Sequence, residues 1–486
     1  MKTLNMKSAK SLLFAAFCKY WLFFPAFLLM AVYLKTTGPM NNFSGDAANI
    51  WTCIKSFPTG TIVPSYVLYK GFGSVYPYVW LYQLSQYFGL SEFVFVKLFH
   101  CLLFAYVSAI GFPYIAERLL QIKPKAWRKA LLILVMFWLW KSNLAFSQVM
   151  VDLPSLAYFI LLVNSALKIS EPDVGWKPVR YIYTGLLLGI NICLSGQYSI
   201  AAMLVLLYII IKTIPYRILC DNVKRWGALL CLAALLLCMA SVKEYNNYFE
   251  KTVTNPLRNQ GAWIPTDETW LSVGFLGRAG VMRWGGGLTI PDNRGLSVLQ
   301  DYYGSEYEAI HARSIGAGYP ISISEYFNIA THYPVDFASR YANRFFVAVT
   351  PDGGSLQVTR LFIIYSLVFA AVASIWYRCK TVKEFFASEI LIVLSFAFSL
   401  SAVVILAVEA RYAMQIQGLI FTAAILDDSI FASIKKYFQK TKTVSLGSKT
   451  IPYMFLMYIL FISLCFMHMA TIYESLGVDA TAVLFK

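Results

Sequence analysis

The sequence predicts an all-α membrane protein that crosses the bilayer many times and carries two long outward-facing loops. Three observations lead to this prediction. The chain of 486 residues is 58% hydrophobic and only 14% charged, whereas a soluble domain is about a quarter charged. Apolar runs that can span a bilayer, or nearly so, recur along the chain. Between them, Lys and Arg cluster at every second connection, as they do in cytoplasmic loops.

The apolar runs predict about eleven spans, with the N-terminus inside and the C-terminus outside. The first run is too long for a signal peptide and lacks a cleavage-site pattern, so we expect it to remain as an anchor. The runs between 129 and 214 are short and interrupted by polar residues, so their boundaries are the least defined. The runs lie at about 12–34, 92–116, 129–140, 154–168, 180–195, 198–214, 226–242, 360–377, 387–408, 411–432 and 451–472.

The two long loops divide the chain into three parts. An N-terminal transmembrane module, 1–242, includes the first outward loop at 36–91. A large outward loop, which is periplasmic in a bacterial inner membrane, covers 243–359, and a C-terminal transmembrane module covers 360–486. A bundle of spans needs only short turns, so loops of this length indicate chemistry or recognition at the outer face.

Both outward loops contain stretches that predict helices at the membrane surface. In the first loop, Tyr76 to Phe88 is rich in aromatic residues, which favour the headgroup region. In the second loop, apolar residues recur at helical spacing from Glu325 to Val349, on both sides of Pro334. This spacing predicts two amphipathic helices. The same loop lacks a strong strand pattern, and its glycine triplet, Gly285 to Gly287, lacks the Lys-Ser/Thr of a phosphate-binding loop.

The net charge of +16 follows the alternation of the loops, so it orients the protein in the membrane and does not indicate a nucleic-acid partner. Two acids stand out against this background. Asp46 lies in the first outward loop, where it is either a general base or divalent-cation ligand, or the N-cap of the helix after it. Asp152 lies at the outer end of an apolar run, just before Pro154. A charge at that depth indicates function, with N-capping as the alternative.

Several cationic and polar residues could assist these acids. The sequence Glu409-Ala410-Arg411-Tyr412 falls at an outer turn, where Arg411 either belongs to a solvated hairpin or binds a phosphate through its planar fork. Arg340 and Arg344 lie four residues apart on one face of a predicted surface helix. That pair could flank an anionic lipid headgroup of the substrate, but ordinary contact with anionic phospholipids is the favoured explanation.

These features together resemble the GT-C superfamily of integral membrane glycosyltransferases. The likeness rests on Asp46, on the aromatic helix from Tyr76 to Phe88, on Asp152, and on Glu409, Arg411 and Tyr412. It implies a polyprenyl-phosphate-linked sugar donor, transfer to a glycan acceptor at the outer face, and inversion at the anomeric carbon. It further implies that Asp46 is the catalytic base or a metal-associated acid.

The resemblance also implies that Arg411 neutralises the donor phosphate, with Lys70 as a second candidate. Ala47 and Ala48 follow Asp46 where many members carry a second acid, which leaves dependence on Mg²⁺ or Mn²⁺ open. The size and loops are similar to those of bacterial enzymes that modify surface glycans such as lipopolysaccharide O-antigen, in the inner membrane.

Two other functions remain open at this point. An O-antigen polymerase or ligase has a similar number of spans and a large late loop, and relies on arginines rather than a first-loop acid. A flippase or other transporter of lipid-linked sugars predicts charges along a pathway through the membrane, and charges inside the apolar runs are few here.

Overall fold

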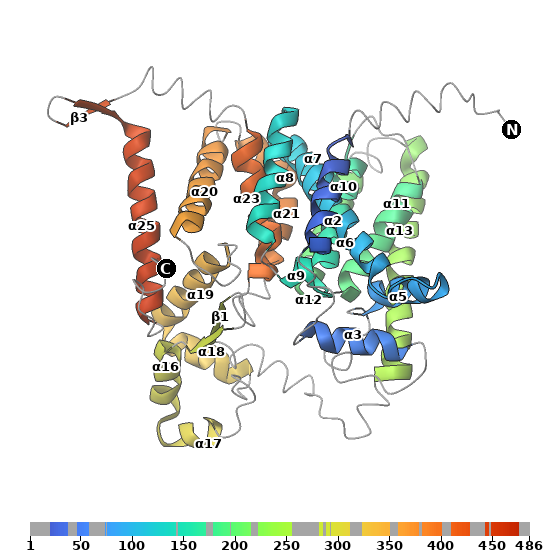
Figure 1. The fold of residues 1–486 in the computed structure, drawn as a ribbon, viewed down its shortest axis with the longest axis horizontal. Coiled ribbons are helices and arrows are strands. Elements are labelled where there is room, and N and C mark those ends of the chain that lie inside the picture. The colour runs from blue at the N-terminus through green and yellow to red at the C-terminus, as the bar shows by residue number, and fades with distance from the viewer. Residues whose placement is uncertain are drawn as a thin grey trace.

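The computed structural model in Figure 1 is a bundle of helices with two short antiparallel hairpins and a smaller group of helices at one end. We call the end where α3 (Asp46–Ser56) and α18 (Ile323–His332) lie the outer end, following the predicted orientation, and the opposite end the inner end. The structure describes residues 20–36, 46–57, 73, 75–141, 144–171, 178–194, 196–214, 222–254, 281–284, 288–291, 293–311, 323–349, 358–378, 382–400, 410–427, 443–446 and 449–475.

The described part of the chain contains five helices that are long and apolar enough to cross a membrane. The predicted helical membrane character is therefore confirmed, and the count of about eleven spans is not. The five are Val94–Leu119, Asp152–Ile169, Trp226–Thr252, Val358–Ile375 and Tyr453–Ile472, and the shorter apolar helices are Phe23–Thr36, Pro178–Leu194, Tyr198–Thr213 and Glu389–Phe398.

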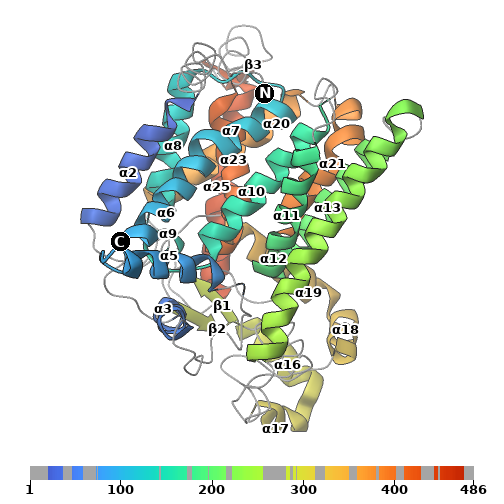
Figure 2. The same ribbon diagram turned by 90° about the vertical axis from the view of Figure 1, so that its right-hand side faces the viewer.

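The helix α10 (Asp152–Ile169) lies at the centre of the bundle. Nearly all of its residues are buried, because apolar or small side chains occupy every face of the helix. Figure 2 shows α10 between α6 and α11. Its main neighbours are α6 (Val94–Tyr106), the π-helical turn η4 (Val107–Gly111), α11 (Pro178–Leu194) and α12 (Gly196–Thr213).

The helix α23 (Met414–Leu426) organises the second half of the bundle, where it packs on α7 (Phe112–Leu119), α8 (Ala126–Trp140) and α20 (Val358–Arg378). The buried amide of Gln417 accepts a hydrogen bond from Trp140 Nε1 at 2.9 Å and donates one to the carbonyl of Ala348, also at 2.9 Å. Because Ala348 belongs to α19 (Pro334–Val349), this amide ties the second outward loop to the membrane bundle.

Close packing of α11 on α13 (Asn222–Phe249) depends on two glycines four residues apart. A Cβ atom on Gly185 would lie 2.3 Å from the carbonyl oxygen of Leu235, and one on Gly189 would lie 2.6 Å from Cβ of Val242. Small residues at this spacing let two helix backbones approach closely in a membrane.

The predicted surface helices are present at the outer end. The aromatic stretch forms α5 (Tyr76–Tyr87), and the stretch around Pro334 forms α18 and α19. The helix α13 continues beyond the apolar run predicted at 226–242, to Phe249. Its last turns are aromatic: Tyr245 contacts Tyr76 with ring centroids 6.1 Å apart, and Phe249 contacts Phe57 at 6.2 Å. The extended helix thus packs on the first outward loop.

The second loop also contains a hairpin, which its sequence did not predict. The strands β1 (Val281–Trp284) and β2 (Leu288–Pro291) pair antiparallel, and the glycine triplet falls between them in sequence, as turn glycines do in hairpins. A small core of its own joins Val298, Leu299 and Tyr307 to Ile329 and Phe337. The remaining elements are α2 (Phe23–Thr36), α9 (Leu144–Ser147), η6 (Glu250–Thr254), α16 (Asn293–Tyr303), η7 (Gly304–Glu306), α17 (Tyr307–His311), α21 (Val382–Phe398), η9 (Ala410–Ala413), β3 (Thr443–Leu446), β4 (Lys449–Pro452) and α25 (Tyr453–Ser475).

Candidate functional site

Two residues singled out from the sequence, Asp152 and Arg411, form an ion pair at the outer end of the bundle. Asp152 Oδ2 lies 3.7 Å from Arg411 Nη1, and only 7% and 11% of the two side chains are exposed. Asp152 is not the N-cap of α10: that position is Val151, which makes no side-chain capping hydrogen bond. The N-capping alternative is therefore wrong, and the carboxylate lies in the first turn, facing a residue from the other half of the chain.

Arg411 is held on further sides by Tyr412 and Met150. Its Nη2 donates a hydrogen bond to the Tyr412 hydroxyl at 3.1 Å, and the guanidinium lies 5.0 Å from the centroid of the Tyr412 ring. Nη1 also contacts Met150 Sδ at 3.7 Å. A guanidinium fixed by a carboxylate, a hydroxyl and an aromatic ring has lost much of its conformational freedom, which is the preorganisation that anion recognition requires.

The segment before Asp152 is anchored by residues that the sequence did not single out. The Tyr78 hydroxyl, from α5, donates to the Met150 carbonyl at 2.5 Å and lies 3.0 Å from His100 Nε2. His100 Nδ1 lies 3.2 Å from the carbonyl of Phe146. Burial raises the pKa of Tyr78 well above its ordinary value, and the negative charge of Asp152 adds to the shift. Tyr78 thus keeps its proton, and the first outward loop fixes the position of Met150.

A second buried amide positions the turn that carries Arg411. Gln415 Nε2 donates to the carbonyls of Tyr412 and Ser399, at 2.8 and 3.1 Å, and its Oε1 accepts a hydrogen bond from the Tyr198 hydroxyl at 3.2 Å. Ser399 belongs to the segment after α21 and Tyr198 to α12, so three elements fix the start of α23. Polar side chains in an apolar run read as interruptions in the sequence, and here they are the bonds that place the site.

The electrostatics of this cluster favour an anion over a metal ion. Both α10 and α23 begin here, at Asp152 and Met414, so the positive ends of their dipoles are directed outward. The negative charge of Asp152 offsets the positive charge of Arg411. The positive potential of the two helix N-termini therefore remains without a compensating charge. A divalent cation requires several oxygen ligands and is repelled by a guanidinium. In the part of the chain that the structure describes, no group of three or more His, Cys, Asp or Glu residues gathers.

The structure does not bring together all of the predicted site residues. Asp46 is the first residue of α3, but its side chain lies outside the described residues, as do Lys70 and Glu409 and the side chain of Arg340. Arg344 does not lie on an exposed helix face as its spacing suggested: it is fully buried, 5.7 Å from the Tyr341 ring centroid. The physical reason is that the last turns of α19 pack into the bundle.

A cavity of about 290 Å³ lies at the opposite, inner end, between α6, α7, α10 and α11. None of the residues predicted for the site lines it. Asn164, Ser165 and Lys168 of its lining come from α10, and the other polar residues come from separate segments of the chain.

Comparisons of the chain with family models, curated proteins and solved structures find no match.

Proposed function

We propose that this chain is a membrane glycosyltransferase. It transfers a sugar from a polyprenyl-phosphate donor to a surface glycan, such as lipopolysaccharide O-antigen, at the periplasmic face of a bacterial inner membrane. The observation that carries the proposal is the Asp152–Arg411 pair, which places a carboxylate and a guanidinium 3.7 Å apart where two helices begin. A donor with a phosphate leaving group and an acceptor with a hydroxyl group need these two functional groups side by side.

Arg411 supplies the phosphate-binding function in this proposal. Its guanidinium presents N–H donors in a planar fork, a geometry that matches the oxygens of a phosphate. The N-terminus of α23 adds the positive end of a helix dipole at the same place. As the sugar–phosphate bond breaks, negative charge grows on the phosphate oxygen, so these groups stabilise the transition state more than the bound donor.

Asp152 supplies the proton acceptor. The acceptor hydroxyl oxygen attacks the anomeric carbon and forms the new glycosidic bond, and its proton passes to the carboxylate. The bond between the anomeric carbon and the phosphate oxygen breaks, and its electron pair leaves with the polyprenyl phosphate. Attack opposite the leaving group inverts the anomeric carbon. Asp46 remains a second candidate for the base, and the tests below include it.

The outward helices supply the enclosure that transfer requires. Water competes with the acceptor hydroxyl, so a transferase has to exclude it. The first loop contributes α5, whose Tyr78 is fully buried beneath the Asp152 segment, and the second loop contributes α19, which Gln417 ties to the bundle. Both loops thus pack against the elements that carry the ion pair.

The experiment is a comparison of surface-glycan structure, by mass spectrometry and NMR, between cells that lack the gene and cells that carry it as wild type, Arg411→Gln or Asp46→Asn. The matched control is Lys35→Gln, which removes an exposed positive charge at the outer end of α2. We expect a sugar branch with the wild type and the control and its loss with Arg411→Gln, at equal amounts of membrane-inserted protein.

Other results would redirect the proposal. A branch that persists in Arg411→Gln removes that residue from the site, and one that persists in Asp46→Asn leaves Asp152 as the base. A change in glycan chain length alone indicates a polymerase or ligase. No difference between cells with and without the gene contradicts glycosyl transfer to the surface glycan and favours transport.

A further inference from the structure

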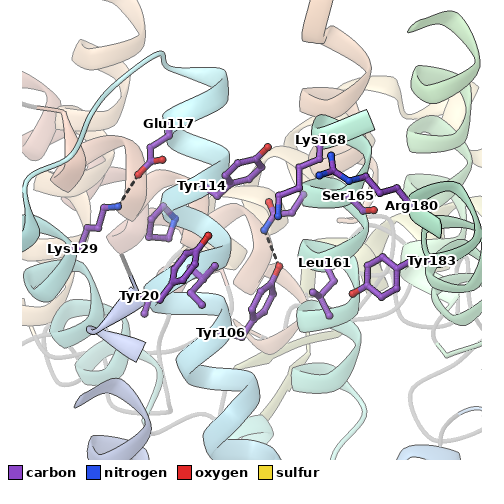
Figure 3. Close-up of a pocket in the computed structure, with 14 residues that line it drawn as sticks. Tyr20, Tyr106, Tyr114, Glu117, Lys129, Leu161, Ser165, Lys168, Arg180 and Tyr183 are labelled. Carbon is purple, nitrogen blue, oxygen red and sulfur yellow. Dashed lines mark hydrogen bonds and ion pairs between the residues drawn. The ribbon is translucent and has the colours of Figure 1, made fainter. Parts of the chain in front are cut away.

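The cavity at the inner end is built as a site, and the proposed function does not use it. Figure 3 shows its lining, in which Glu117 and Lys129 lie on one side, Lys168 and Arg180 lie on the other, and Tyr114 lies between the two groups. Its volume is about 290 Å³. The lining residues are Tyr20, Tyr106, Ala109, Ile110, Pro113, Tyr114, Glu117, Lys129, Leu161, Asn164, Ser165, Lys168, Arg180 and Tyr183.

The charges that line this cavity do not balance. Lys129 and Glu117 neutralise each other, with 2.7 Å between Nζ and Oε1. Lys168 and Arg180 remain. Within the described part of the chain, Lys168 contacts the Tyr114 ring, with Nζ 5.2 Å from its centroid, and neither cation forms an ion pair. The nearby acid Glu171 is held by Arg118 at 3.4 Å and accepts a hydrogen bond from Tyr114 at 3.0 Å. The cavity therefore has an excess of two positive charges.

Two polar atoms of the lining are buried without a hydrogen-bond partner. Arg180 Nη1 is a donor without an acceptor, and Asn164 Oδ1 is an acceptor without a donor. Asn164 is only 5% exposed, and its amide nitrogen already donates to the Tyr106 hydroxyl at 2.8 Å. An unsatisfied buried polar atom costs about 1–3 kcal/mol, so both atoms indicate that something with an acceptor and a donor fills this space.

The position of the cavity indicates whether its ligand comes from the membrane or from the aqueous solution. Lys168 is in the last turn of α10 and Arg180 is near the start of α11, so both cations lie at the inner ends of membrane helices. Aromatic side chains at the edge of the cavity are open to the surroundings: Tyr20 is 39% exposed and Tyr183 is 44% exposed. The walls include Ile110 and Leu161. Cations at headgroup depth above an apolar, aromatic wall match a lipid with an anionic head.

We propose that this cavity binds the phosphate headgroup of one anionic membrane lipid from the inner leaflet. Lys168 and Arg180 hold the phosphate, and the uncharged walls take the first part of the chains. Asn164 Oδ1 accepts a hydrogen bond from a headgroup hydroxyl or from an enclosed water. This lipid site is separate from the Asp152–Arg411 cluster, which lies at the other end of α10, so it stands whether or not the chain transfers sugars.

The test uses the purified full-length protein in detergent, titrated with dioleoylphosphatidylglycerol. Native mass spectrometry measures the fraction of protein that carries one added lipid. We expect saturable binding of one lipid, and about tenfold weaker binding in Arg180→Gln and in Lys168→Gln, because each loses a charged hydrogen bond to the phosphate. The matched control is Lys123→Gln, which removes an exposed inner-end charge outside the cavity and is expected to bind like the wild type.

A second variant tests the cavity without changing its charge. Leu161→Trp fills the space and is expected to weaken lipid binding although both cations remain. The melting temperature of Arg180→Gln without lipid shows whether that variant folds. If it does not fold, the lipid binding of Leu161→Trp tests the proposal in its place. Wild-type binding in Arg180→Gln and Leu161→Trp would overturn the proposal. Equal weakening in Lys123→Gln would reduce it to general surface attraction. Equal affinity for inorganic phosphate, measured by its competition with the lipid, would overturn the lipid assignment.

Discussion

The two ends of α10 carry charges of opposite sign in different surroundings: an acid in a buried ion pair at the outer end, and a cation in a cavity at the inner end. At the outer end, Asp152 lies 3.7 Å from Arg411, and hydrogen bonds from Gln415 and Tyr78 fix the segments that carry the two partners. At the inner end, Lys168 lies beside Arg180 in a cavity with no carboxylate assigned to either. Both charges suit the helix dipole, which favours an acid in the first turn and a base in the last. The difference is that the outer charge has an ion-pair partner, whereas the inner one has none among the residues that the structure describes.

This contrast separates two kinds of site. A charge that is buried with a fixed partner can bind a ligand only in a set geometry, as a catalytic centre requires. A cation at an open cavity without a fixed partner gains its counterion from outside, which suits binding rather than chemistry. Changes at the outer end should therefore affect transfer, and changes at the inner end should affect lipid binding.

The largest expected effect comes from removing the outer guanidinium. Arg411→Gln should lower the rate of sugar transfer by about 10²–10³-fold, which is the usual loss when one preorganised donor to a developing anion is removed. Arg411→Lys should recover only part of that rate, because an ammonium group lacks the planar fork. The measurement is the amount of branched glycan formed per membrane-inserted protein. A rate in Arg411→Gln within twofold of the wild type would assign the ion pair to stability alone.

The next effect concerns the helix that carries Arg180. Gly185→Val should destabilise the protein by about 1–3 kcal/mol, because the new side chain meets the Leu235 backbone of α13, which cannot rotate away. Thermal unfolding in detergent measures this cost. Because α11 must shift, lipid binding should weaken as well, while transfer by the folded fraction should be retained. Unchanged stability would show that α11 and α13 do not pack this closely.

A smaller effect is expected from the inner cation on α10 itself. Lys168→Gln should weaken phosphatidylglycerol binding about tenfold and leave glycan branching unchanged, because the residue lies at the other end of the helix from Asp152. Both quantities can be measured on the same variant. A loss of branching in Lys168→Gln with retained lipid binding would contradict the assignment of transfer to the outer end of α10 and lipid binding to the inner end.

The smallest effect is expected at the anchor of the Asp152 segment. Tyr78→Phe removes the hydrogen bond to the Met150 carbonyl, which should cost about 1 kcal/mol of stability. It should lower transfer by less than Arg411→Gln does, because Tyr78 acts by positioning. Supply of a higher donor concentration should not restore the rate, since the change displaces Asp152 rather than the phosphate site. A melting temperature equal to that of the wild type would contradict this role.

The outer cluster was partly predictable from the sequence, and the inner cavity was not. Asp152 and Arg411 stand out because each is a charge at the edge of an apolar run, where its burial has to be compensated. That they pair is a fact of tertiary packing, set by Gln415 and Met150, which carry no signal of their own. Tyr78 and His100 were missed because an aromatic residue in a surface helix and a histidine in a span have ordinary structural explanations.

The cavity was missed for a different physical reason. Lys168 and Arg180 follow the general rule that cations gather at the inner ends of spans, so charge patterning alone cannot separate them from their neighbours. Only the structure shows that Lys129 is neutralised by Glu117, whereas no acid among the described residues forms an ion pair with Lys168 or Arg180. The surface helices, in contrast, follow from local periodicity and were predicted with close boundaries, whereas the hairpin depends on pairing between two short strands.

The most direct test of the central claim compares two buried acids. Asp152 lies at the outer end, and Asp427 lies at the inner end of α23, where its carboxylate accepts a hydrogen bond from Ser374. Surface glycan is measured in cells that carry Asp152→Asn or Asp427→Asn at matched levels of inserted protein. We expect that Asp152→Asn abolishes the added sugar, whereas Asp427→Asn keeps it. Equal glycan from both variants, with the sugar present, would contradict the claim that the Asp152–Arg411 cluster carries out transfer.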